Sequence, residues 1–476
     1  MTDSFHVSTV YADGKGERIR YNSDMPREMR HREKPMRSED EKMITQLPLH
    51  FIPLSNELKK DSPNPHVISS CLKSIVITLE LCPFPFDKFM AFNVHEDLFK
   101  LINKKRSEED ILNALKIIGY YYCSIPEGCQ VIHSSGLTNL LIQMLQDDEN
   151  KPFLKPLFAA LAGIIRFIPG FNEDFLSNHA EEQVIYLYDT FNENPLDKEV
   201  AMIIKALMMG QISSEFLAAL IPLLRPLNNF VLSKQIDLSR LSIQAVRHLL
   251  INNPQIKPEI INSGYLVSIF QESLTSETPF PIFKTALYFL RIICNHDIDL
   301  CNQFFTSELL NSASIQIHYN SYRTEQIKNV IIDLGSIMLN DPMLTYVVIG
   351  SPYFETLFEL AQKASFIICI ECCRTLCFMV TTRYQDVIDS LMNNNFFNCL
   401  QQILTYDDDM ANLVGLDALN IILEIYNTSQ LTNWAECIKG QDWLCETISD
   451  LIENENEEIA QSAQYIFGCL SKLFDE

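Results

Sequence analysis

Hydrophobic positions along the chain recur as pairs of apolar helical segments joined by a short polar turn. In each copy, an apolar helix end leads into a small or amide residue, and a second apolar segment starts a few residues later. Residues 89–92 precede Asn93, for example, and residues 97–102 follow it; residues 131–132 precede Gly136, and residues 140–145 follow it. This spacing is typical of amphipathic helices packed in sets.

The turns between these segments are regularly spaced. Most neighbouring turns are 43 or 45 residues apart, and the interval from His179 to Gly264 is about twice that; the turn positions are Asn93, Gly136, His179, Gly264, Ser307, Pro352, Asn395 and Gly440. A period near 43 residues in an all-helical pattern falls in the range of armadillo and HEAT repeats. Gly or Asn at such a turn suits a residue that must adopt a positive φ between two helices.

Counted from about His66 to the end, the period gives about ten repeats. One repeat cannot bury its apolar face alone, so neighbouring repeats must stack into one continuous core. We therefore predict an all-α fold: an armadillo-type right-handed α-solenoid of about ten three-helix repeats over residues 46–476. The concave surface of such an array binds extended peptides or partner helices and offers no catalytic pocket that excludes water.

Composition and charge narrow the class of partner. With only 14 Gly in 476 residues, the chain is poor in the Gly-rich turns of Rossmann units, barrels and β-sandwiches. Lys and Arg total 37 against 61 Asp and Glu, giving a net charge of −24. An acidic body repels nucleic acid and attracts basic partners.

Residues 1–45 differ from the body because nine basic and nine acidic residues leave them with no net charge. Their apolar content is low, so we expect this segment to be a flexible tail. One interpretation is a merely solvating tail. The other is a basic segment that pairs with an acidic groove, in the same chain or on another protein.

Residues 1–42 contain no apolar run of signal-peptide length, and no stretch of about 18 apolar residues follows. We therefore expect a cytoplasmic or nuclear protein without a membrane span, whose 14 cysteines are reduced thiols. Cys369, Cys372, Cys373 and Cys377 follow one helical face. Because a zinc site would usually need a second ligand pair, we interpret them as small apolar side chains of a core helix.

The chain has no sequence pattern for nucleotide binding or hydrolysis. Gly-x-x-x-x-Gly-Lys-Ser/Thr, Gly-x-Gly-x-x-Gly, His-Glu-x-x-His and Gly-x-Ser-x-Gly are all missing. We interpret the acidic runs at residues 407–409 and 453–458 as solvated surface rather than as acid–base groups. The sequence therefore predicts no enzyme activity, no cofactor and no metal.

Two C-terminal segments and the tail resemble one known family. Residues 434–438 and 448–459 look like the final repeat of importin alpha, the armadillo adaptor of nuclear import, and residues 415–423 look like the helix before it. Residues 27–37 are similar to a thinned version of the importin-beta-binding segment. The resemblance implies that this tail docks on an importin-beta-type carrier and folds back into the groove without cargo. The matching basic residues are Arg27, Arg30, Arg32, Lys34 and Arg37.

The family binds basic nuclear localisation signals with Trp and Asn pairs on the third helices of selected repeats. The matching positions here are Lys116, Tyr120, Ala159, Gly163, Ile332, Ser336, Arg374 and Phe378. None of them is Trp or Asn, and the two tryptophans, Trp434 and Trp443, lie near the C-terminus. Lys116 and Arg374 would oppose a basic cargo.

The resemblance thus implies a nuclear import adaptor that is present in cytoplasm and nucleus. It would bind basic protein cargo in an acidic concave groove and an importin-beta-type carrier through its tail. The missing Trp and Asn pairs favour the alternative, an armadillo scaffold for protein interactions without transport activity. Under both hypotheses we expect a monomer whose partners are proteins, with no binding to nucleic acid or membranes.

Overall fold

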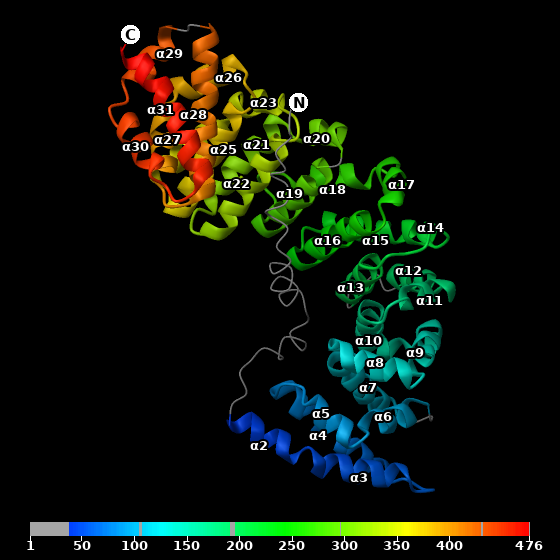
Figure 1. Ribbon diagram of the computed structural model, residues 1–476. Coiled ribbons are helices and arrows are strands. Elements are labelled where there is room, and N and C mark those ends of the chain that lie inside the picture. The colour runs from blue at the N-terminus through cyan, green and yellow to red at the C-terminus, as the bar shows by residue number, and fades with distance from the viewer. Residues whose placement is uncertain (1–37, 104–106, 191–195, 296, 430–431, 476) are drawn as a thin grey trace. The chain divides into compact units, whose positions relative to one another are not determined.

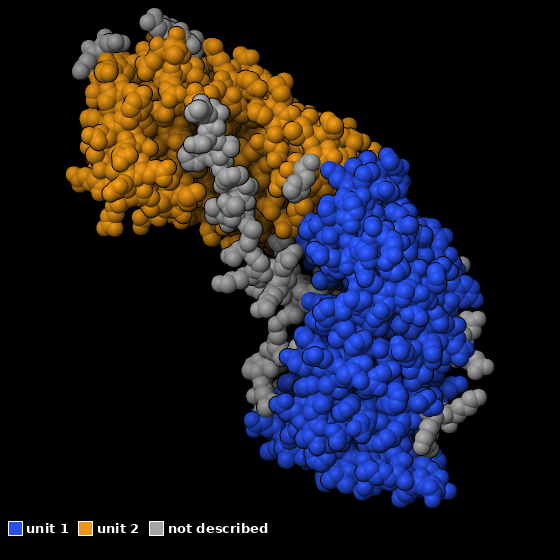
Figure 2. All heavy atoms as spheres, turned by 45° about the vertical axis from the view of Figure 1, so that its right-hand side comes forward, with its two compact units in different colours: residues 1–266 blue, residues 267–476 orange. Residues whose placement is uncertain are grey.

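All regular secondary structure in the described part of the chain is helical. The structure is a computed structural model that describes residues 38–103, 107–190, 196–295, 297–429 and 432–475. Within these ranges there is no strand, and no helix is both long and apolar enough to cross a membrane. The all-α prediction is confirmed. The chain divides into two compact units, Met1–Leu266 and Val267–Glu476 (Figure 2).

Unit 1 starts with α2 (Ser38–Gln46), α3 (Pro48–Leu58) and α4 (Pro65–Leu81). Four sets of helices follow. The first two are α5 (Phe86–Ala91), α6 (Val94–Asn103) and α7 (Glu108–Lys116) with η3 (Ile117–Tyr121) and η4 (Tyr122–Ser124), and then α8 (Pro126–Ser134), α9 (Leu137–Gln146), η5 (Asp148–Phe153) and α10 (Leu154–Phe167). The last two are α11 (Phe171–Ser177), α12 (Ala180–Thr190) and α13 (Asp197–Met208), and then α14 (Leu217–Leu220), η6 (Ile221–Leu223), α15 (Leu224–Leu232) and α16 (Ile236–Asn252). The unit closes with η7 (Pro254–Ile256), α17 (Lys257–Asn262) and the start of α18 (Tyr265–Ser273).

Unit 2 contains the rest of α18, then α19 (Phe280–Cys294) and four further sets. These are α20 (Ile298–Phe304), α21 (Ser307–Tyr319) and α22 (Thr324–Met338); α23 (Leu344–Ile349), α24 (Pro352–Lys363) and α25 (Phe366–Val380); α26 (Gln385–Asn393), α27 (Phe396–Leu404) and α28 (Asp409–Ser429); and α29 (Thr432–Lys439), α30 (Leu444–Ile452) and α31 (Glu457–Asp475).

The last helix of each set, which we call the third helix, forms the spine of each unit (Figure 1). In unit 1, successive contacts link α4, α7, α10, α13 and α16; in unit 2, they link α19, α22, α25, α28 and α31. A third helix touches the third helix on either side and the shorter helices of its own set. It is therefore apolar over most of its surface, and ten of the 14 residues of α10 are buried.

Five of the predicted turn positions have a positive φ between the first and second helix of a set. They are Asn93 (51°), Gly136 (77°), His179 (52°), Gly264 (76°) and Asn395 (60°). Ser307 and Pro352 instead lie in the first turn of α21 and α24, and the side chain of Thr306 caps α21. Gly440 lacks a positive φ as well. Five of the eight predicted turn positions therefore use the left-handed conformation, and three do not.

The cysteine-rich segment lies in α25. Cys372, Cys373 and Cys377 are fully buried, and Cys369 is half-buried and donates from Sγ to Gln402 Oε1 at 2.6 Å. Burial raises the pKa of the Cys372 and Cys377 thiols, which keeps them protonated. These contacts confirm the interpretation as core side chains.

The predicted tail overlaps the first described helix. Residues 38–45, which were expected to be flexible, belong to α2, and Ile44 is buried where α2 contacts α3 and α4. Helical packing therefore begins before residue 46, with Asp40 and Ile44 buried and Lys88 Nζ donating to the carbonyl oxygen of Ile44.

Two glycines allow α10 to approach the preceding third helix closely. A Cβ at Gly163 would lie 2.1 Å from the carbonyl oxygen of Cys123, and one at Gly119 would lie 2.2 Å from that of Pro156. Both contacts are to backbone, which cannot move aside as a flexible side chain does. Gly119 belongs to the π-helical turn η3 that continues α7.

We predict that Gly163→Ala lowers the stability of the chain, by about 1–3 kcal/mol, because the added methyl group forces the helices apart. The matched control is Gly468→Ala in α31, where a Cβ meets no atom within 4 Å and the change should stabilise the helix by up to about 1 kcal/mol. Thermal unfolding followed by circular dichroism measures both. Equal midpoints for the two variants would contradict the close-packing role of Gly163.

Candidate functional site

All eight positions that match the family's Trp and Asn pairs lie on third helices or their continuation. Lys116 and Tyr120 lie in α7 and η3, and the other six lie in α10 (Ala159, Gly163), α22 (Ile332, Ser336) and α25 (Arg374, Phe378). Ala159 is only 4 % exposed, and Gly163 packs on the backbone of Cys123, so neither offers a side chain to a ligand. The five tail residues, from Arg27 to Arg37, lie outside the described residues.

The charge of Arg374 is balanced within unit 2. Its guanidinium lies 3.4 Å from Glu371 on the same helix and 3.0 Å from Asp408, and its side chain is only 15 % exposed. Asp408 also accepts from the backbone N–H of Ala411 at 2.8 Å at the start of α28. Asp408 is thus a surface carboxylate, 41 % exposed, that also forms an ion pair, and Arg374 is less opposed to a basic ligand than expected.

An acidic hollow of about 260 Å³ opens between α28 and α31 in unit 2. Asp417 and Asn420 line it from α28, and Gln461 and Tyr465 from α31; each pair is about one turn apart. The Tyr465 side chain is 58 % exposed, so its ring is accessible to a ligand.

The electrostatics of this acidic hollow favour a cation. Partial removal from water and the nearby Glu458 carboxylate raise the pKa of Asp417. Among the described residues, neither carboxylate takes part in an ion pair. Asn420 donates to Glu424 Oε1 at 3.1 Å, and its buried Oδ1 has no hydrogen-bond partner there. The hollow therefore presents the Asp417 carboxylate, with the charge of Glu458 acting on it, where a Lys or Arg head group would be stabilised.

Sequence reasoning missed this site. Residues 415–423 were used only for the family resemblance, and the acidic residues 453–458 were interpreted as solvated surface. The available signal was Asp417 and Asn420 on one face of a third helix, with Glu458 41 residues later, close to one repeat period.

A cationic cluster lies on the third helices of unit 1, in a body predicted to be acidic. It consists of Arg166 on α10, Lys205 on α13, and Arg247 and His248 on α16. Lys205 Nζ donates to Gln244 Oε1, and Arg247 Nη2 lies 3.2 Å from His248 Nε2. Lys205 and Arg247 are 7 % and 8 % exposed, whereas Arg166 and His248 are half-buried.

Burial and the neighbouring cations act on His248 in the same direction. Burial, followed by the charges of Arg247, Lys205 and Arg166, lowers the pKa of His248 to about 3. Burial also lowers the pKa of Arg166 to about 10, so its guanidinium remains charged near neutral pH. The imidazole is thus neutral and accepts a hydrogen bond from Arg247.

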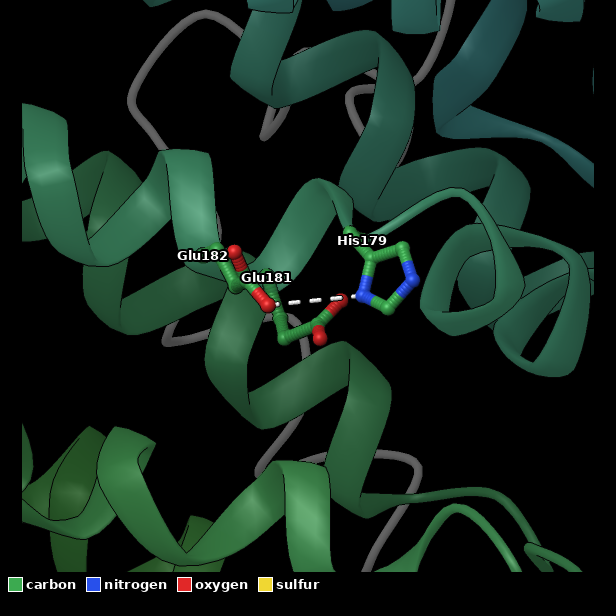
Figure 3. Close-up of side chains that lie close together, drawn as sticks. All are labelled: His179, Glu181 and Glu182. Atoms are coloured by element: carbon green, nitrogen blue, oxygen red, sulfur yellow. Dashed lines mark ion pairs between the residues drawn. The ribbon is translucent and has the colours of Figure 1, made fainter.

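A third group of polar residues lies at the start of α12. His179, Glu181 and Glu182 bring possible metal-ligand atoms within 4.8 Å of one another, and Figure 3 shows the Glu181 carboxylate beside the pair that His179 Nδ1 and Glu182 Oε1 form at 3.3 Å. Both carboxylates belong to the first helical turn, where the helix dipole already favours negative charge. Helix geometry accounts for this group, and it gives no evidence of a metal site.

We predict that His248 makes stability depend on pH. An unfolded His titrates near 6.5, but folded His248 stays neutral down to a pH of about 3. The unfolded chain therefore binds the additional proton, and the free energy of unfolding falls as the pH drops from about 6.5 towards 3. His248→Gln should reduce the difference in unfolding temperature between about pH 7 and about pH 4.5. The exposed His66→Gln is the control, and the same pH dependence in both variants would contradict the prediction.

Comparison with known proteins gives a likeness of fold only. No model of a known protein family matches the chain, and no curated protein matches it. Among solved structures, it is similar to an engineered protein whose crystal structure was determined by the Northeast Structural Genomics Consortium. The TM-score is 0.63 at 16% sequence identity, and the alignment covers 90% of this chain and 96% of that chain. At this identity the likeness extends to the fold alone, which is all-α in the described residues.

Proposed function

We propose that the chain is an importin-alpha-like nuclear import adaptor, built as an armadillo-type right-handed α-solenoid of about ten three-helix repeats. The repeat architecture is supported by the 43-residue period and by the third-helix contacts within each unit. Each repeat would bury its apolar face against the next, leaving the third helices to form a surface for extended protein segments.

The acidic hollow between α28 and α31 is the observation that carries the cargo proposal. A Lys or Arg side chain of the cargo lays its stem along the Tyr465 ring and brings its charge to Asp417 and Glu458. Asn420 and Gln461 add polar groups to the lining of the same hollow. The hollow thus does with Tyr and carboxylates what the family does with Trp and Asn.

The carrier proposal rests on the basic tail. Arg27, Arg30, Arg32, Lys34 and Arg37 would bind an importin-beta-type carrier and allow the protein to move between cytoplasm and nucleus. The adaptor would act as a monomer that binds proteins and not nucleic acid or membranes.

The second candidate is an armadillo scaffold without transport activity. It is favoured by the identity of the eight third-helix positions, none of which carries Trp or Asn. The acidic hollow would then bind a basic partner, but the tail would bind no carrier. The two candidate functions therefore differ in whether the tail binds a carrier, and both assign the binding of a basic partner to the hollow.

The hollow is tested with a basic peptide rich in Lys and Arg. Asp417→Asn combined with Glu458→Gln should weaken its binding about tenfold, because each partly exposed ion pair contributes about 0.5–1 kcal/mol. Isothermal titration calorimetry of the full chain measures the effect. The matched control is Glu308→Gln combined with Asp386→Asn, which removes two exposed carboxylates from other helices of unit 2.

Wild-type affinity in the Asp417 and Glu458 variant would place cargo binding elsewhere. The binding should also weaken as the pH falls below the raised pKa of Asp417, since the protonated carboxyl no longer attracts a cation.

The carrier is tested by calorimetry with importin beta at two salt concentrations. The full chain should bind more weakly at high salt, and a variant lacking residues 1–37, which keeps α2, should not bind. Reversal of three charges (Arg30→Glu, Arg32→Glu and Arg37→Glu) should also weaken binding. The control reverses Lys15, Arg18 and Arg20 in the same tail. If the full chain does not bind, the scaffold without transport activity is the correct reading.

A further inference from the structure

Large apolar side chains are exposed in unit 2 where α25 and α28 begin. Phe366 and Ile367 are the first two residues of α25, and Met410 is the second residue of α28; their exposed fractions are 56 %, 43 % and 48 %. The ring of Tyr406, in the turn before α28, packs edge-on against Phe366 with the ring centroids 4.6 Å apart. We call these four residues the apolar edge. Single exposed apolar side chains are ordinary, but a cluster of large ones marks an interaction site.

Carboxylates lie beside the apolar edge. Asp407 and Asp409 are exposed and follow Tyr406 in the same turn. Asp409 Oδ2 accepts from Asn456 Nδ2 at 2.9 Å, and a neutral amide leaves the negative charge in place. The apolar surface is therefore bordered by negative charge.

The cations on the helices that form this part of unit 2 already have partners. Lys363 and Arg374 are the only Lys or Arg residues in α24, α25, α27 and α28. Lys363 Nζ lies 3.4 Å from Glu359, and Arg374 lies 3.0 Å from Asp408. On these helices, no cation is left over to balance the two exposed carboxylates.

Hydrogen bonds hold the turn that carries Tyr406. The backbone N–H of Asp408 donates to the carbonyl oxygen of Tyr406 at 2.9 Å, and the carbonyl oxygen of Asp408 accepts from the N–H of Asn412 at 3.0 Å. The ion pair of Asp408 with Arg374 fixes the same turn to α25. A surface held in this way loses little conformational freedom when it binds a ligand, which favours binding.

We propose that the apolar edge binds a short segment of a partner protein in which a large apolar side chain is flanked by Lys or Arg. The apolar side chain covers Phe366 and Met410, and the flanking cations meet Asp407 and Asp409. This surface is separate from the acidic hollow, because Asp417 lies about two helical turns further along α28. It requires an apolar side chain that the hollow does not, and it does not depend on nuclear transport.

A basic partner segment fits this surface better than a second copy of the chain. Two copies with a net charge of −24 each repel one another. A symmetric contact through the apolar edge would also bring Asp407 and Asp409 of the two copies close together.

The test uses fluorescence anisotropy and a labelled peptide with Phe between two pairs of Lys. The full chain carries Asp417→Asn and Glu458→Gln throughout, so that the acidic hollow does not contribute. The Phe peptide should bind to this chain, and the same peptide with Ser in place of Phe should bind at least about fivefold more weakly, because less apolar surface is buried.

In this background, Phe366→Ser combined with Met410→Ser should weaken binding of the Phe peptide at least about fivefold and leave the Ser peptide unchanged. The matched control is Ile298→Ser combined with Met343→Ser, which removes two similarly exposed apolar side chains of unit 2 and should change the affinity less than about twofold. All four side chains are more than 40 % exposed, so the variants should fold, which thermal unfolding checks.

A second variant tests the charges. Asp407→Asn combined with Asp409→Asn should weaken binding about threefold and reduce its dependence on salt. Asp408 is left unchanged because it pairs with Arg374.

No binding of the Phe peptide in the hollow-free background, or equal loss in the control, would overturn the proposal and leave the proposed cargo site intact. The cargo site fails by a different result, which is wild-type affinity for the peptide rich in Lys and Arg after the hollow has been changed. Dimerisation of the chain in sedimentation experiments, abolished by Phe366→Ser with Met410→Ser, would overturn the proposal in favour of a second copy.

Discussion

The contact between successive third helices is the interaction on which each unit depends. It buries apolar side chains on both sides of α10 and α13 in unit 1, and of α22, α25 and α28 in unit 2. Hydrophobic burial of this kind is the main favourable term in folding, and it is available only to a helix with neighbours on both sides. The cysteines of α25 are part of the same core, since small side chains fit where helices lie close.

The same packing decides where polar chemistry lies. Third-helix side chains that point away from the contacts are still crowded by neighbouring helices, so their charges are only partly hydrated. In unit 1 this lowers the pKa of His248 beside three cations, and in unit 2 it raises the pKa of Asp417 beside Glu458. Opposite potentials in two parts of one chain are therefore compatible with a single architecture, because the core fixes the backbone and leaves the outward residues open to vary.

The backbone conformation at a turn could be predicted from the sequence where the residue type strongly favours one conformation. Asn93 and Gly136 take the left-handed conformation that their residue types suggested, but α21 and α24 begin differently, with a Thr306 cap and with Pro352 in the first turn. Several conformations can join two helices, so the turn position is predictable and its φ is not. The same holds for the eight positions that match the family's Trp and Asn pairs. Their helices were predicted, but the burial of Ala159 depends on what packs against α10.

The sequence by itself determined the helical class, the period and the core character of the cysteine-rich segment. The helical class and the core character depend on residues within a turn or two of one another, where side-chain spacing and backbone preference act directly, and the period is the spacing at which these local patterns recur. Only the tertiary structure decided which charges meet. Arg166 and Lys205, 39 residues apart, both act on His248, and Glu458 acts on Asp417, 41 residues before it, because third helices stack. Net charge sums over the whole chain, and it cannot reveal a local field that packing creates.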